Sequence, residues 1–81
     1  MHEVNLTGSL REAADGASRI RVEAATIREL LTRIVERFPG MQTHLDEGIA
    51  VSINGEIFRD NWSETIPEGA EVFLLPRIQG G

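Results

Sequence analysis

The sequence contains no cysteine, and all eight of its basic residues are arginine, so lysine is missing as well. Without cysteine, the chain has no disulfides, no cysteine nucleophile and no thiolate metal site. Without lysine, it cannot build chains in which one copy is attached to a lysine of another copy. Attachment of this chain to lysines of other proteins stays open.

Long apolar runs and clusters of positive charge are also missing. The formal net charge is -5 at pH 7, whereas a nucleic-acid or anionic-membrane surface needs clustered positive charge. No stretch approaches the length that crosses a bilayer, and the start, MHEVNLTGS, has no basic region followed by an apolar run. We therefore expect a cytoplasmic protein that binds neither nucleic acid nor membranes and whose partners present basic patches.

Catalytic and metal-binding patterns are scarce. A chain of 81 residues forms one small domain around a single core, which leaves little room for an enclosed active site. His2 and His44 are distant in sequence and have no companion ligands at metal spacing, so we expect plain surface or edge histidines and no metal site. None of the serines lies in a nucleophile-elbow context, so hydrolase chemistry is not supported.

Two strands and one helix are predicted in the first half of the chain. Apolar residues alternate in residues 2–6 and again in 19–23, which is typical of half-buried strands and favours an antiparallel hairpin. Residues 26–40, TIRELLTRIVERFPG, carry an apolar stripe at helical spacing. Thr26 and Glu29 form a capping-box pattern at its start, and Pro39 with Gly40 ends it.

The second half predicts three more strands. Residues 41–48, MQTHLDEG, are interpreted as a polar connection. The strand IAVSI follows, and Asn54 with Gly55 predicts a tight hairpin into the short strand EIF. Trp62 is interpreted as a packing anchor over the sheet edge, and residues 71–75 as the last strand. One amphipathic helix must then cover one face of the sheet in a two-layer α+β domain, leaving the other face open.

The sequence ends in RIQGG, and glycine is the poorest residue for ordering a chain end because it has the most backbone freedom to lose. We therefore expect that the terminal carboxylate, and not packing, accounts for Gly80 and Gly81. The competing explanation is a frayed end or a cloning scar.

The order of elements, the INGE hairpin, the PEGAEVFLLP segment and the terminal RIQGG together resemble the ubiquitin-like β-grasp sulfur carriers. The resemblance is greatest to the small subunit of molybdopterin synthase and to its relatives in thiamine and cysteine synthesis. It covers the full length and implies an α+β, ubiquitin-like β-grasp fold: a mixed sheet of about four or five strands with one main helix packed on one face. The implied division is a domain at 1–76 and a flexible tail at 77–81.

The resemblance implies a carrier or co-substrate and not an enzyme, although such a chain can be counted as the small subunit of a synthase. A carboxylate is a poor electrophile, so an activating adenylyltransferase similar to the ubiquitin-activating enzymes would use ATP to adenylate Gly81. Gly80 and Gly81 have no β-carbon and can thread a narrow channel. A persulfide then produces a thiocarboxylate, which a sulfur-accepting synthase subunit, most of all of the molybdopterin type, would receive. No permanently bound cofactor is implied.

Partner binding is predicted for Phe73, Leu75, Arg77 and Ile78. If Val72 and Leu74 face the helix, alternation places Phe73 and Leu75 on the open face, where two large apolar side chains suggest a partner site. The opposite register, or scattered surface apolar residues, is the competing explanation. The alternative function is a ubiquitin-like protein modifier, or a non-catalytic β-grasp interaction module.

Overall fold

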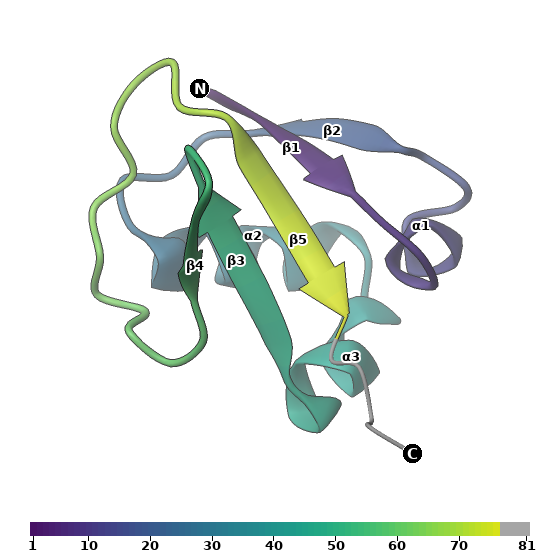
Figure 1. Ribbon diagram of the computed structural model, residues 1–81. Coiled ribbons are helices and arrows are strands. Elements are labelled where there is room, and N and C mark those ends of the chain that lie inside the picture. Colours follow the sequence, from purple (N-terminus) through teal and green to yellow (C-terminus); the bar gives the residue numbers. More distant parts are fainter. Residues whose placement is uncertain (77–81) are drawn as a thin grey trace.

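The computed structural model describes residues 1–76. Their strands form one five-stranded sheet in the order β2-β1-β5-β3-β4, and the helices pack behind it in Figure 1. The strands are β1 (His2–Leu6), β2 (Arg19–Val22), β3 (Ile49–Ile53), β4 (Glu56–Phe58) and β5 (Val72–Pro76). The helices are α1 (Leu10–Ala13), α2 (Ile27–Arg37) and α3 (Met41–Glu47). This arrangement confirms the predicted two-layer α+β fold.

The sheet is mixed, because its first and last strands lie side by side at its centre and run parallel, whereas the other neighbouring strands are antiparallel. β1 pairs antiparallel with β2 and parallel with β5, and β5 pairs antiparallel with β3. The predicted hairpin of the first two strands is therefore confirmed. Asn54 and Gly55, which connect β3 to β4, have positive φ angles of 51° and 88°, as the two-residue turn between these strands requires.

The main helix, α2, begins where the sequence predicts. The Thr26 side chain accepts a hydrogen bond from the Glu29 backbone N–H at 3.3 Å, and the Glu29 carboxylate accepts one from the Ala25 N–H at 2.8 Å. The buried face of the helix consists of Ile27, Leu30, Leu31 and Ile34. Burial of this stripe against the sheet holds the two layers together.

The interpretation of residues 41–48 as a polar connection was wrong, because Met41–Glu47 forms α3. Met41 is fully buried, and Leu45, one helical turn later, packs against the core. Only these two apolar residues anchor the helix, so its sequence shows almost no periodic stripe. The core supplies the stability that the local pattern does not indicate.

His2 was also predicted incorrectly, because it is neither a surface nor an edge residue. Strand alternation places His2 on the same face of β1 as Val4 and Leu6, and it is only 3% exposed. Its Nε2 lies 2.8 Å from the Ala24 carbonyl oxygen. Since a carbonyl oxygen only accepts, Nε2 carries the proton and donates to it.

Candidate functional site

The strand β5 leads directly to the C-terminal segment that the sequence singles out. Val72 and Leu74 are completely buried beneath the helices, whereas Phe73 and Leu75 are partly exposed. Alternation along the strand therefore places Phe73 and Leu75 on the face opposite the helices. The register predicted for the last strand is confirmed.

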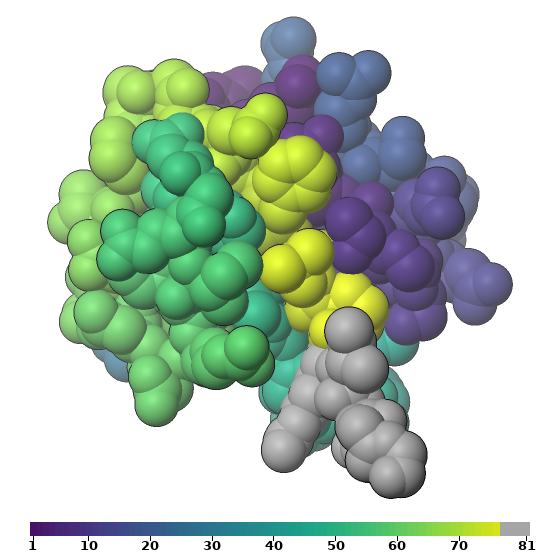
Figure 2. Space-filling view, viewed as in Figure 1, coloured from purple at the N-terminus to yellow at the C-terminus, as the bar shows by residue number. Residues whose placement is uncertain are grey.

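We call the surface opposite the helices the open sheet face. Phe73 lies at its centre, because its backbone neighbours are Asn5 on β1 and Ser52 on β3. Leu75 lies beside Ala50, and Ile57 on β4 lies beside Ser52. Figure 2 shows this side of the molecule, with β5 in yellow between the green strands and the purple β1.

The open sheet face has an apolar half and a charged half. Phe73, Leu75 and Ile57 occupy the half formed by β5, β3 and β4, and Ile57 is 45% exposed. On the other half, Arg19 of β2 lies 3.4 Å from the Glu3 carboxylate of β1 in an exposed pair. A large apolar residue exposed beside two others makes this half a candidate binding surface. Ile57 was not among the predicted site residues, because a three-residue strand shows too little alternation to indicate which face each side chain takes.

A hollow of about 560 Å³ extends this apolar half to the end of β5. It is lined by Gly48, Ile49, Ala50, Ile57, Arg59, Leu75 and Pro76. Pro76 is the last described residue, so the hollow lies at the point from which the chain continues into 77–81. A partner seated on this half of the sheet would also contact the start of the C-terminal segment.

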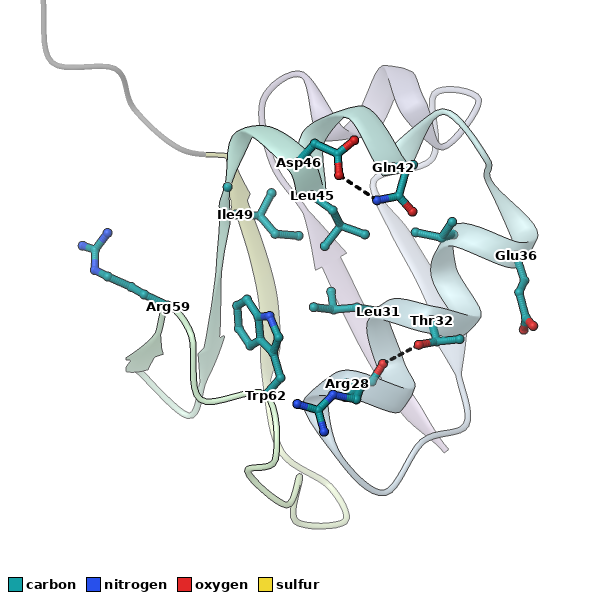
Figure 3. A pocket seen from close by; sticks show the side chains of 12 residues that line it. Arg28, Leu31, Thr32, Glu36, Gln42, Leu45, Asp46, Ile49, Arg59 and Trp62 are labelled. Atoms are coloured by element: carbon teal, nitrogen blue, oxygen red, sulfur yellow. Dashed lines mark hydrogen bonds between the residues drawn. The ribbon is translucent and has the colours of Figure 1, made fainter.

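A second hollow, of about 600 Å³, lies on the helix side of β3 (Figure 3). Leu31, Leu45, Ile49 and Trp62 contribute its apolar wall, and the Asp46 carboxylate there accepts a hydrogen bond from Gln42 at 2.9 Å. Trp62 is partly buried and packs against the core, which confirms its predicted role as a packing anchor. Within residues 1–76, no group of acidic or histidine side chains could hold a metal ion.

The charged groups near the N-terminus lie at the other end of the central strands. The N-terminal amine lies 3.0 Å from Glu68 and is the main reason that the pKa of this carboxyl is lowered. Both groups are well exposed, so screening by solvent keeps the pair weak.

Four of the residues that the sequence also singles out lie outside the described residues: Arg77, Ile78, Gly80 and Gly81. Among residues 1–76, no helix is long and apolar enough to span a membrane.

Comparison with known protein families covers both the described domain and the C-terminal segment. The sequence matches the ThiS family over residues 4–81, which is nearly the whole chain. The chain belongs to the ThiS family. Membership confirms the resemblance to the ubiquitin-like β-grasp sulfur carriers, so this chain is a carrier protein of that kind. No match was found among curated protein sequences.

Solved structures share the fold of this ThiS-family chain over almost their full lengths. SAMP1 from Haloferax volcanii is 29% identical, with a TM-score of 0.78, and the alignment covers 98% of this chain and 97% of that one. In the BexX/CysO complex of Amycolatopsis orientalis, the matching chain is 23% identical, with a TM-score of 0.78 and coverage of 98% of both chains. The match in the complex of subunits 1 and 2 of the molybdopterin-converting factor from Helicobacter pylori is 24% identical, with a TM-score of 0.68 and coverage of 98% and 96%.

Proposed function

We propose that the carboxylate of Gly81 is the group that carries sulfur in this ThiS-family protein. The observation that supports this most directly is the family match, which extends through residue 81. The described domain supplies the rest of the carrier: a stable core and the apolar half of the open sheet face beside the end of β5. Phe73, Leu75 and Ile57 would dock the partner, and Arg77 and Ile78 would be covered in the same complex.

Activation requires a leaving group, because sulfur nucleophiles do not displace oxide from a carboxylate at neutral pH. An ATP-dependent adenylyltransferase would join the Gly81 carboxylate to AMP and release pyrophosphate. Hydrosulfide can then displace AMP and produce the thiocarboxylate directly. A persulfide would instead form an acyl disulfide, and a second thiol would have to reduce it to the thiocarboxylate. ATP belongs to the partner in this scheme, and the carrier holds no cofactor of its own.

The acceptor of the sulfur would be a synthase subunit that docks on the same open sheet face. Two of the similar structures are complexes of a carrier-like chain with a second protein, BexX in one and subunit 2 of the molybdopterin-converting factor in the other. Because one face beside one chain end would serve both partners, activation and delivery would take place in turn. Among the possible acceptors, we favour a synthase subunit of the molybdopterin type.

A second candidate function is protein modification, in which Gly81 forms an amide with a lysine of another protein. The similarity to SAMP1 supports it, since a protein of that name from Methanosarcina acetivorans is described as a small archaeal modifier protein. Because the chain has no lysine, an attached copy could not be extended into a lysine-linked chain. Both functions begin with the same adenylated end and differ in the nucleophile that follows.

Mass spectrometry of the protein purified from its own host separates the two candidates. A sulfur carrier would show an intact chain with one oxygen replaced by sulfur, and alkylation would label that sulfur. A modifier would show Gly81 joined to lysine side chains in peptides from other proteins. A chain recovered only as the free carboxylate, even after incubation with host extract, ATP and a sulfur source, would contradict both.

A further inference from the structure

The turn that follows β1 lies against the last residue of β5. β1 pairs with β5 only as far as Leu6 opposite Leu74. On the other side, β3 continues to pair with β5 as far as Ile49 opposite Pro76. The last two residues of β5 therefore have a strand neighbour on one side only, and the turn takes the place of β1 on the other. In Figure 2 the purple segment lies against the yellow end of β5.

Two contacts join this turn to the end of β5. The Thr7 hydroxyl donates a hydrogen bond to the Leu74 carbonyl oxygen at 3.1 Å. Gly8 lies so close to the Pro76 ring that a Cβ atom added to it would be 3.3 Å from Pro76 Cγ. The turn itself is anchored, because the side chain of Leu10, at the start of α1, is completely buried in the core.

Gly8 meets two separate requirements at this position. Its φ of +57° lies in the left-handed region, which residues with a β-carbon rarely adopt. It also leaves the space that the Pro76 ring occupies. Either requirement alone favours glycine, but only the second one concerns the end of β5.

We propose that Thr7 and Gly8 are positioning residues that set the direction in which the chain leaves β5 toward its reactive end. Pro76 is held between Ile49 of β3 and the Thr7–Gly8 turn, and its ring leaves the backbone little torsional freedom there. The point of departure is thereby fixed relative to Phe73 and Leu75 on the open sheet face. A partner docked on that face then meets the start of the C-terminal segment at a fixed place beside Phe73 and Leu75. This inference rests on the proposed role of Gly81.

The test compares Gly8→Ala with Gly16→Ala in the full-length chain. Gly16 lies in the same connection between β1 and β2 and also has a positive φ, +86°, but a Cβ added there meets nothing within 4 Å. Both variants therefore strain the backbone, and only Gly8→Ala pushes on Pro76. The assay is ATP–pyrophosphate exchange with the activating enzyme from the protein's own host, at varied carrier concentration.

We expect Gly8→Ala to lower kcat roughly tenfold with little change in KM, because docking on the open sheet face is intact while Pro76, from which the chain continues toward its reactive end, is displaced. Gly16→Ala should keep the kcat of the parent. The Tm of the two variants, measured by thermal melts, should fall by similar amounts. Adding Pro76→Ala to Gly8→Ala removes the crowded ring atoms and should bring kcat back to that of Pro76→Ala alone. Thr7→Val, which removes the hydroxyl and keeps the shape, should lower kcat in the same direction if Gly8→Ala does not fold.

Equal kcat values for Gly8→Ala and Gly16→Ala would overturn the positioning role while leaving the carrier function in place. A higher KM with an unchanged kcat would also overturn the positioning role, because that result would assign the turn to docking. If the parent chain itself supports no pyrophosphate exchange with the host's adenylyltransferases, the proposed function fails, and this inference fails with it.

Discussion

Val72 and Phe73 are consecutive residues of β5 whose side chains lie on opposite faces of the sheet. Val72 is 0% exposed in the core, whereas Phe73 is partly exposed at the centre of the open sheet face. Truncation of each residue to alanine should therefore affect different properties. Val72→Ala should affect folding, and Phe73→Ala should affect partner binding.

The expected effects on stability follow from burial. Val72→Ala removes fully buried methyl groups, at about 0.8 kcal/mol for each buried carbon plus a cavity contribution, or about 2–3 kcal/mol in total. In a domain of this size, each kcal/mol lowers Tm by roughly 4–8 °C, so Val72→Ala should lower Tm by about 10 °C or more. Phe73→Ala shortens a partly exposed side chain whose cross-strand neighbours are Asn5 and Ser52, at about 1 kcal/mol or less.

The expected effects on binding are reversed. An aromatic anchor at the centre of an interface commonly contributes about 2 kcal/mol or more, so Phe73→Ala should raise the Kd for the activating enzyme or the synthase about 30-fold. Val72→Ala, measured well below its Tm, should bind within about threefold of the parent. Calorimetric titration of the partner and thermal melts by circular dichroism measure the two properties separately.

Two results would refute this reasoning. If Phe73→Ala lowers Tm as much as Val72→Ala does, Phe73 belongs to the core and the assigned faces of β5 are wrong. If Phe73→Ala changes neither Tm nor Kd, the open sheet face is not the interface, and partner recognition must depend on other parts of the carrier.

Three further predictions test the chain end, the helix and the buried histidine. Deletion of Gly81 should abolish pyrophosphate exchange without changing Tm, because the described core ends at β5; a large drop in Tm would contradict this. Leu31→Ala and Ile34→Ala should each cost about 2–5 kcal/mol in urea unfolding, because both side chains are buried under α2, and parent-like unfolding would show that this face does not form the core. His2→Ala should cost about 2 kcal/mol or more, because it leaves a cavity and removes the donor to the Ala24 carbonyl; a stability equal to the parent would contradict the buried contact.

The two sequence predictions that failed share a physical cause. α3 and His2 both depend on burial that arises only when segments far apart in sequence come together. Met41 anchors a helix whose own residues have almost no apolar stripe, and His2 is placed in the core by the alternation of β1. A polar or ionisable side chain at a core position is recognised only when its partner is known, and here that partner is the Ala24 carbonyl, 22 residues away.

Local patterns were sufficient for most of the fold and for part of the site. The spacing of Ile27, Leu30 and Ile34 predicted α2, and the pair of Asn54 and Gly55 predicted the hairpin between β3 and β4. Both signals act between residues close in sequence, where side-chain type strongly favours one helical or turn geometry. Alternation within β5 likewise indicated that Phe73 would face away from the helices, once one helix was assigned to cover the sheet.

The sequence by itself indicated the family of this protein, because the INGE hairpin, the PEGAEVFLLP segment and RIQGG together resemble the ubiquitin-like β-grasp sulfur carriers. Only the tertiary structure decided where the candidate binding surface lies. Ile57 joins Phe73 through the pairing of β3 with both of their strands, and Gly8 reaches Pro76 across 68 positions of the sequence. These contacts depend on strand order and register, which arise when the whole sheet closes around its core and which no local pattern specifies.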